Sequence, residues 1–231
     1  MKNLEERFRI LIIEDDQEIS RLLCMIIEKA GMVAVPAYSG TEGLLQLQQN
    51  SYDLVLLDLM LPGMSGEEFI MQVREENTLP IIVISAKVGI EEKVEVLKMG
   101  ADDYITKPFN KQEVMARVEV QLRKSSDQLT RPSKTERVWR DLKIHPDKRS
   151  VTLENQELQL TNAEFDILLF LVSAPERAFS KRQIYEGIWT GPYLGDDNTI
   201  SVHVSNIRKK MAGITSVEYI KTIWGVGFML I

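Results

Sequence analysis

The chain has little cysteine and no long apolar run, and both shortages limit what it can be. Its single cysteine, Cys24, excludes an internal disulfide and makes a cytoplasmic protein the first expectation. No apolar run approaches the roughly 18 residues that a membrane helix needs. The charged N-terminal residues 1–7 lack the apolar core of a signal peptide, so we expect neither membrane insertion nor secretion.

The length of 231 residues suits two domains better than one. Hydrophobic residues make up 44% of the chain and charged residues 27%, which is ordinary for a globular protein. Residues 1–122 carry 12 basic against 21 acidic side chains, whereas residues 123–231 carry 16 against 13. The acidic first part disfavours contact with nucleic acid, and the mildly basic second part permits it.

Strand and helix patterns alternate through the first part of the chain. Five short apolar segments have the composition of strands buried on both faces of a parallel sheet; they span residues 8–13, 33–38, 54–58, 81–85 and 104–106. Helical periodicity follows each of them, at residues 18–30, 41–50, 67–76, 90–99 and 111–124, with Gly31 and Gly100 where two helices should end. This pattern predicts an α/β fold for residues 1–123, with a five-stranded doubly wound parallel sheet.

The periodicity stops between residues 124 and 137, where polar residues and a proline predict a linker. Beyond it, residues 138–144 and 150–160 have the pattern of short antiparallel strands, with turns at residues 145–148 and 154–157. Helices are predicted at residues 161–173, 180–189 and 198–211, the first opened by a capping box of Thr161 and Glu164. A glycine-turned hairpin over residues 219–231 completes the expected second domain, residues 138–231.

Polar residues stand at the ends of four predicted strands of the first domain; they are Glu14-Asp15-Asp16, Asp58, Ser85 and Lys107. In an open α/β sheet, ligands bind outside the carboxyl ends of the strands, so these groups should share one crevice. A hard cation such as Mg2+ offsets the repulsion among the carboxylates. Asp58 can then accept a phosphoryl group by nucleophilic attack, while Lys107 neutralises charge and Ser85 donates a hydrogen bond to a phosphoryl oxygen.

Each of these elements has an ordinary alternative when it is taken alone. The acidic run is equally well a solvated loop, in which Asp16 caps the following helix. Lys107 before a proline is an ordinary surface lysine, and Ser85 is an ordinary strand-end serine. Their occurrence together, in order and at strand ends, favours the phosphoryl pocket.

Residues 8–123 resemble the receiver domain of two-component response regulators. The matching segments are Glu14-Asp15, residues 52–58 (YDLVLLD), residues 62–66 (PGMSG), Ser85-Ala86 and residues 100–109 (GADDYITKPF). The resemblance implies that Asp58 is phosphorylated and that Mg2+ is bound by Glu14, Asp15, Asp58 and the backbone carbonyl of Met60. It also implies a switch, in which Ser85 moves to the phosphoryl group and Tyr104 rotates inward, and a cis Lys107–Pro108 bond.

The same resemblance implies a dimer face on residues 90–99, 104–106 and 111–123. The side chains that match the family's salt-bridging set are Lys93, Asp102, Asp103, Glu113 and Arg117. Glu119 departs from the family, which often has a basic residue there, and this weakens the expected dimer by one exposed pair worth about 0–1 kcal/mol. The alternative is that these charges only solvate the surface.

The run of residues 197–211 has a basic amphipathic pattern, with Ile200, Val204, Ile207 and Met211 on one helical stripe. Such a helix can pack by its stripe and place polar and basic side chains in a DNA major groove. The glycine-turned hairpin that follows would supply a wing that reaches the DNA backbone or minor groove. Because amphipathic basic helices are common, the helix without the hairpin would not be persuasive.

Residues 138–231 resemble the winged-helix effector of the OmpR/PhoB type. The matching segments are residues 160–168 (LTNAEFDIL), residues 179–184 (FSKRQI), Ile188-Trp189, residues 202–204 (VHV) and residues 220–228 (IKTIWGVGF). The DNA-contacting side chains that this implies are Ser201, Ser205, Asn206, Arg208, Lys209, Thr222 and Trp224.

Base recognition is where the sequence departs from this family, which often carries arginine at the positions of Asn198, Ser205, Asn206 and Trp224. The remaining phosphate-contacting charges are Arg208, Lys209 and Lys210. Asn206 can pair with adenine N6 and N7, which favours A·T-containing sites.

Two residues and one loop of the second domain have more than one interpretation. We expect Trp224 to pack against the protein, the alternative being that it stacks on a sugar. His203 lies among apolar residues and is expected to be structural. Residues 190–197 lie where the family contacts RNA polymerase, or they are a plain connector.

We therefore expect a DNA-binding transcription regulator whose Asp58 is phosphorylated by a sensor histidine kinase. Phosphorylation would promote a homodimer that binds tandem half-sites on double-stranded DNA. One alternative is a transcription factor that works as a preformed dimer without phosphate. The other is a metal-dependent phosphotransferase or phosphatase; against it, Met60 stands where such an enzyme would have a second aspartate, so we expect at most slow self-phosphorylation from small donors and slow self-dephosphorylation.

Overall fold

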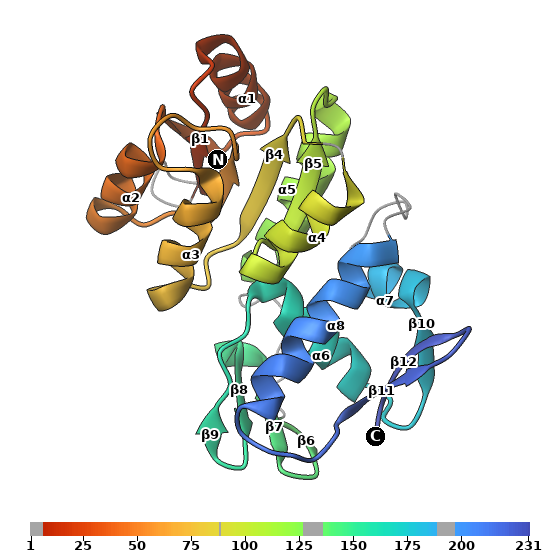
Figure 1. Cartoon of the computed structure of the whole chain (residues 1–231). Helices are drawn as coiled ribbons and strands as arrows, with labels where there is room; N and C mark the ends of the chain where they lie inside the picture. Colours follow the sequence, from red (N-terminus) through yellow and green to blue (C-terminus); the bar gives the residue numbers. More distant parts are fainter. Residues whose placement is uncertain (1–6, 88, 127–135, 189–196) are drawn as a thin grey trace. The chain divides into compact units, whose positions relative to one another are not determined.

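A computed structural model describes residues 7–87, 89–126, 136–188 and 197–231 of the chain. The chain divides into two compact units, Met1–Ser126 and Asp127–Ile231. Figure 1 shows the elements of each unit, which are described separately below.

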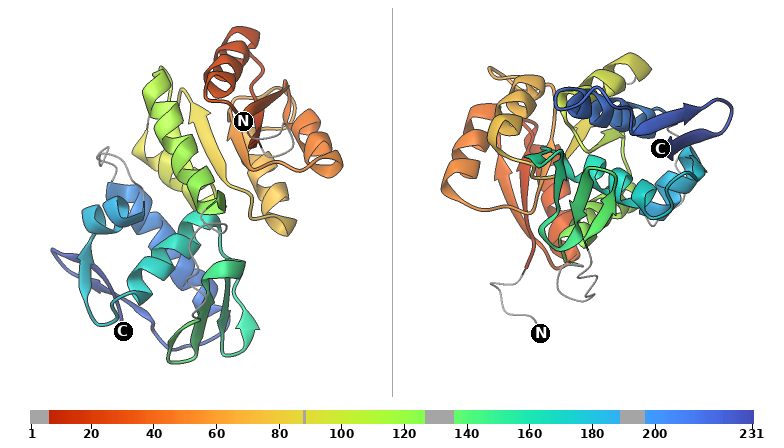
Figure 2. Two further views of the ribbon diagram at one scale, coloured as in Figure 1. Left: turned by 180° about the vertical axis from the view of Figure 1, so that it is seen from behind. Right: turned by 90° about the horizontal axis from the view of Figure 1, so that it is seen from below.

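The first unit is built on one parallel sheet with the strand order β2-β1-β3-β4-β5. Its strands are β1 (Arg9–Ile13), β2 (Val33–Ala37), β3 (Leu54–Leu57), β4 (Ile81–Ser85) and β5 (Asp103–Thr106). The connecting helices are α1 (Gln17–Lys29), α2 (Gly40–Gln49), α3 (Gly66–Glu76), α4 (Ile90–Met99) and α5 (Lys111–Ser126). Helices lie on both faces of the sheet, as Figure 1 and Figure 2 show, so the predicted doubly wound α/β fold is confirmed.

Apolar side chains from the sheet and two helices form the core on one of these faces. Leu23 of α1 and Val114 of α5 belong to the same buried cluster as Ile12 of β1 and Leu56 of β3. Strands β3 and β4 are buried along their whole length, as expected for a sheet covered on both sides. This packing holds the strand ends at fixed positions.

Local capping explains where several helices begin and end. The Asp16 carboxylate accepts hydrogen bonds from the backbone N–H groups of Glu18 and Ile19, so the predicted cap of α1 is confirmed. Ser65 and Glu68 form a capping box at α3. Gly100 ends α4 with a φ of 115°, a conformation that favours glycine.

The second unit combines two antiparallel sheets with a group of helices. The first sheet contains β6 (Arg137–Trp139), β7 (Leu142–His145), β8 (Ser150–Leu153) and β9 (Gln156–Glu157), with a short 3-10 helix η3 (Pro146–Lys148) between β7 and β8. Helices α6 (Asn162–Val172), α7 (Lys181–Ile188) and α8 (Asp197–Ala212) follow. The second sheet has the order β10-β12-β11, from β10 (Ala178–Ser180), β11 (Ile220–Ile223) and β12 (Gly227–Leu230). The predicted winged-helix arrangement is confirmed.

Several predicted boundaries in the second half are wrong in detail. The expected strand at residues 138–144 is two strands, because Arg140 has a φ of 53° and turns the chain between β6 and β7. The turn predicted at residues 154–157 is confirmed at Glu154 and Asn155, which have positive φ, but Gln156–Glu157 form β9 instead. Strand β10 was not predicted, and it pairs with β12. The capping box of Thr161 and Glu164 is confirmed.

The predicted linker, residues 124–137, is shortened at both ends. Helix α5 continues to Ser126, and β6 already begins at Arg137. The rest of that prediction, residues 127–135, lies outside the described residues, as do residues 190–196 of the predicted polymerase-contacting loop. Among the residues that are described, no helix is both long and apolar enough to span a membrane.

Candidate functional site

Four strands of the first unit end at one edge of the sheet and carry polar residues there. Glu14 follows β1, Asp58 follows β3, Ser85 ends β4, and Lys107 follows β5. Parallel pairing places the carboxyl ends of these strands side by side. Glu14, Asp58 and Ser85 are buried, with 1%, 6% and 0% of their surfaces exposed.

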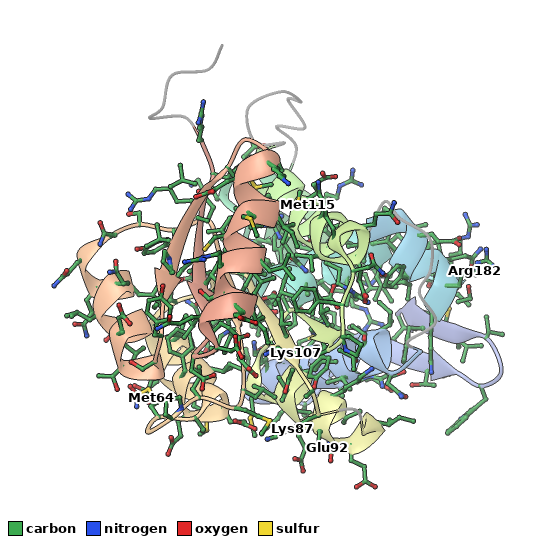
Figure 3. The ribbon with its side chains drawn as sticks, turned by 90° about the horizontal axis from the view of Figure 1, so that it is seen from above. Met64, Lys87, Glu92, Lys107, Met115 and Arg182 are labelled. Atoms are coloured by element: carbon green, nitrogen blue, oxygen red, sulfur yellow. The ribbon has the colours of Figure 1, made fainter. Side chains whose placement is uncertain are left out.

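Lys107 joins two buried carboxylates. Its Nζ donates to Oδ2 of Asp58 at 2.6 Å and to the two carboxylate oxygens of Glu14 at 2.8 and 3.0 Å. Although burial opposes it, hydrogen bonding to Asp58 and Glu14 raises the pKa of the Lys107 ammonium, which stays charged. Lys107, labelled in Figure 3, therefore lies at the centre of the pocket as the predicted phosphoryl-neutralising group should.

Glu14 holds its proton more tightly than an ordinary glutamate. Burial raises its pKa to about 7, the hydrogen bond from Lys107 opposes this rise, and the Asp58 charge adds to it. The buried Glu14 carboxylate is therefore costly to ionise, and the neighbouring Asp58 charge adds to that cost. A further cation would relieve the repulsion.

The carboxylates of Glu14, Asp15 and Asp58 each offer an oxygen within 4.8 Å of the others, and Asp15 is exposed to solvent while the other two are buried. Such an oxygen-rich set fits a hard divalent cation that keeps part of its water shell. The Met60 backbone N–H donates to Oδ1 of Asp58 at 3.1 Å and so fixes the loop beside the acceptor. The role predicted for the Met60 carbonyl remains a prediction.

The predicted switch pair lies next to the pocket. The Ser85 hydroxyl accepts a hydrogen bond from the Lys87 backbone N–H at 3.3 Å. The Tyr104 ring is buried, and its hydroxyl donates to the Lys87 carbonyl. Burial raises the pKa of Tyr104, so the hydroxyl stays protonated. The ring therefore occupies the inward position that the switch hypothesis assigns to the active receiver.

Sequence analysis missed the second anchor of this loop. Lys87 Nζ forms an ion pair of 2.7 Å with Glu67 at the start of α3, and Lys93 lies over the Tyr104 ring at 5.4 Å. Lys87 is also labelled in Figure 3. No local pattern in the sequence indicates the pair of Lys87 and Glu67, because it joins the loop after β4 to the first turn of α3. The loop after β4 is thus held from α3 and from β5, and the β5 ring that holds it is in turn contacted from α4.

Three of the residues predicted for the dimer face form one cluster. Arg117 Nη1 contacts both carboxylate oxygens of Asp103 at 2.7 and 2.9 Å, and Nη2 lies 3.3 Å from Glu113. Asp102 does not belong with them, and its prediction is corrected. Its side chain is fully buried, pairs with Arg74 Nη2 at 2.9 Å, and accepts from the backbone N–H of Ile81 at 3.0 Å.

In the second unit, α8 presents two different faces. The predicted stripe of Ile200, Val204, Ile207 and Met211 is buried, and so is His203. Ser205 and Lys209 are exposed, whereas Ser201 and Asn206 are half-buried. The packing stripe is confirmed, and the exposed polar face of α8 is available to nucleic acid.

Two basic residues that sequence analysis assigned to phosphate contact serve the protein's own structure. Arg208 Nε donates to the Ile220 carbonyl and Nη2 donates to the Thr222 hydroxyl, each at 2.9 Å. Burial lowers the pKa of this guanidinium. Lys210 Nζ pairs with the buried carboxylate of Glu164 at 2.6 Å. These contacts tie α8 to β11 and to α6.

Trp224 contradicts the expectation that it packs. It is 92% exposed and lies in the turn between β11 and β12. Beside this hairpin, a groove of about 600 Å³ runs between the N-terminus of α7, α8 and the wing. Its lining includes Lys181, Arg182, Ser201, Arg208 and Trp224.

Comparisons with known proteins agree with both units. Residues 10–119 match the family described as "Response regulator receiver domain", and residues 155–230 match "Transcriptional regulatory protein, C terminal". The chain is 40% identical over 223 residues to the uncharacterized transcriptional regulatory protein YcbL of Bacillus subtilis, covering 95% of this chain and 99% of the relative. It is also similar to the transcriptional regulatory protein SrrA of Staphylococcus aureus, with 37% identity over 227 residues, 95% of this chain and 93% of SrrA.

Similar solved structures also span nearly the whole chain. A mutant of RitR has a TM-score of 0.78 and 24% identity, covering 97% of this chain and 99% of its own; at that identity it supports the fold alone. The response regulator DrrB of Thermotoga maritima, an OmpR/PhoB homolog, has a TM-score of 0.52 and 28% identity, with the same coverage.

Proposed function

Because the chain belongs to the two-component response regulators of the OmpR/PhoB family, with a receiver and a DNA-binding domain, we propose that phosphorylation of Asp58 controls its binding to DNA. The observation that carries this proposal is the pocket in which Lys107 bridges Asp58 and Glu14 beside the exposed Asp15. A sensor histidine kinase supplies the phosphoryl group, and the target is a promoter in the cytoplasm.

The transfer is a displacement at phosphorus. An oxygen of the Asp58 carboxylate forms the new P–O bond while the P–N bond of the donor phosphohistidine breaks, and the leaving imidazole takes up a proton. Lys107, already 2.6 Å from Asp58, contacts the transferred group and offsets its charge. Catalysis is then largely positioning and charge neutralisation.

Mg2+ is the proposed cofactor of this pocket. Glu14, Asp15 and Asp58 would hold it, together with the Met60 carbonyl. Bound there, it would neutralise charge on the phosphoryl oxygens. The raised pKa of Glu14 supports the choice, because burial and, to a smaller extent, the charge of Asp58 disfavour the ionised carboxylate, and a bound divalent cation would favour it.

The signal leaves the pocket through the loop after β4. A phosphoryl group adds about −1.5 to −2 charges and several acceptor oxygens, to which the Ser85 hydroxyl can donate. Movement of Ser85 also moves Lys87, whose carbonyl holds the Tyr104 hydroxyl. The proposed result is a change on the α4-β5-α5 surface, around Lys93, Asp103, Glu113 and Arg117, that favours a homodimer on tandem half-sites and contact with RNA polymerase.

Two alternative functions assign a different role to Asp58. The inward position of Tyr104 favours a preformed dimer that needs no phosphate. A phosphotransferase acting on other substrates is disfavoured, since Met60 offers no acid or base; we propose that the chemistry is limited to slow self-phosphorylation and self-dephosphorylation.

The test of the phosphorylation chemistry uses the full chain incubated with acetyl phosphate and Mg2+. Intact-mass analysis should show one phosphoryl group on the wild type, none on Asp58→Ala, and one on the control Asp147→Ala, which changes an exposed aspartate of the second unit. Incorporation that persists in Asp58→Ala would disprove the assignment of the acceptor.

A further inference from the structure

The turn of the wing carries an exposed apolar pair. Trp224 is 92% exposed and Val226 is 50% exposed, with Gly225 between them at a φ of 73°. The Val226 N–H donates to the Ile223 carbonyl at 3.0 Å, which closes the turn tightly. Figure 1 shows the β11–β12 hairpin protruding from the second unit. Exposed tryptophan in a fixed turn is unusual for a surface that meets only water.

The hairpin is rigidly connected to α8. Arg208 of α8 binds both the Ile220 carbonyl and the Thr222 hydroxyl of β11. When the exposed face of α8 enters a major groove, the turn is therefore carried with it toward the neighbouring groove. Its position on DNA is set by α8 rather than by its own contacts.

The charge of the surface around the turn indicates which ligand the turn contacts. The groove beside the wing is lined by Lys181 and Arg182 at the start of α7, and Lys221 is exposed on β11. These cations suit a polyanion. Residues 222–231, however, contain no charged side chain, so the turn itself cannot neutralise a phosphate. An uncharged turn next to cationic walls fits the apolar sugar walls and base edges of a minor groove.

We infer that Trp224 and Val226 form an apolar wedge that enters the minor groove of bound DNA and selects an easily deformed base step. Pyrimidine–purine steps such as TA and CA unstack with the least resistance, and apolar side chains that press on such steps widen or kink the groove. Sequence preference would then come from Trp224 at a step that α8 does not touch. This inference rests on the proposed function, because it needs DNA at α8.

The test is selection from a pool of random-sequence 30-bp duplexes by the full chain, with Mg2+ and beryllofluoride as phosphoryl mimic. Wild type should enrich the bases read by α8 and a TA or CA step at a fixed distance from them. Trp224→Ala should keep the α8 bases, lose the step, and bind the selected duplex about tenfold more weakly. The control Val138→Ala, which changes an apolar residue of β6 that is 54% exposed, should match the wild type.

Salt dependence separates a wedge from a phosphate contact. Trp224→Ala should leave the slope of log affinity against log salt unchanged, because the wedge releases no counterion. Trp224→Arg should steepen that slope by about one unit and move the preference toward narrow A-tract minor grooves. Since the side chain is exposed, neither change should affect folding.

Three results would overturn the inference in distinguishable ways. If Trp224→Ala selects the same sequences with the same affinity as wild type, the Trp224 side chain makes no contribution to DNA binding and the wedge does not exist. If Trp224→Ala flattens the salt slope, the wing acts electrostatically. If the wild type retains no DNA at all, the proposed function itself fails, whatever the state of the wing.

Discussion

The phosphoryl pocket and the DNA-contacting surface use their charged residues in opposite ways. In the first unit, the buried carboxylates of Glu14 and Asp58 pair with the half-buried Lys107 at the place where chemistry is proposed. In the second unit, Arg208 and Lys210 pair inside the domain, and the exposed surface retains Ser205, Lys209 and Trp224. A charge on a functional helix therefore does not by itself indicate a ligand contact.

The difference follows from how each site is built. Parallel strands bring their carboxyl ends to one edge, so residues at strand ends must meet whatever their neighbours are. A helix surface has no such constraint, and whether a basic side chain contacts DNA or the protein depends on what packs beside it. In this chain β11 packs beside α8, and the Ile220 carbonyl and the Thr222 hydroxyl of β11 accept hydrogen bonds from Arg208.

Replacing Asp102 should give the largest loss of stability and would show that it is not a surface charge. Asp102→Ala removes the carboxylate that pairs with the largely buried Arg74 guanidinium. It also removes the acceptor of the hydrogen bond from the Ile81 N–H. We expect the first unit to lose about 3 kcal/mol of unfolding free energy. Urea unfolding followed by far-UV circular dichroism measures it.

The control for this comparison is Glu119→Ala, an exposed acid on α5, which should change stability by less than about 0.5 kcal/mol. Equal, small effects from both substitutions would contradict the burial of Asp102. In that case Asp102 would belong to the exposed dimer face, as the sequence predicted.

Arg208 and Lys209 are adjacent on α8 and should respond differently to removal. Arg208→Ala breaks two hydrogen bonds to β11 and should destabilise the second unit by about 2 kcal/mol. Lys209→Ala should leave stability within about 0.5 kcal/mol and reduce the salt slope of DNA binding by about 0.9. All three tryptophans lie beyond residue 138, so tryptophan fluorescence follows unfolding of this unit alone.

A result in which Arg208→Ala is stable and only the salt slope falls would show that its guanidinium contacts phosphate. Arg208 and Lys209 would then both be DNA-facing charges.

Addition of Mg2+ should stabilise the first unit and not the second. A ligand that binds only the native state at about ten times its dissociation constant contributes about 1.4 kcal/mol. In urea unfolding followed by far-UV circular dichroism, Mg2+ should move the unfolding midpoint of the first unit to higher urea. The unfolding midpoint of the second unit, followed by tryptophan fluorescence, should not change. Asp15→Ala removes an exposed proposed ligand and should abolish the shift. A shift that survives in Asp15→Ala would place the cation elsewhere.

Much of the receiver could be predicted from sequence because its signals are local and repeated. The apolar strands, the Asp16 cap and Gly100 are each visible within a few residues. Strand β10 escaped prediction because three residues, Ala178–Ser180, show no alternation until β12 pairs with them. The exposure of Trp224 was also missed, since an aromatic residue in a turn carries no sequence signal that separates packing from protrusion.

Pairs between distant segments were the other source of error. Arg74 with Asp102 and Lys87 with Glu67 join elements that only the folded chain brings together. The pocket residues also come from distant segments, but the topology of the sheet dictates their meeting. Side chains on helix and loop surfaces lack that constraint.

The most direct test of the account compares wild type with Asp58→Ala in Mg2+, with and without beryllofluoride, by measuring molar mass and retention of the selected duplex in the same samples. If phosphorylation of Asp58 is the switch, beryllofluoride raises the molar mass toward a dimer and tightens DNA binding in the wild type, and it changes neither in Asp58→Ala. Equal dimerisation and DNA binding by both proteins without beryllofluoride would contradict phosphorylation control and establish the preformed dimer.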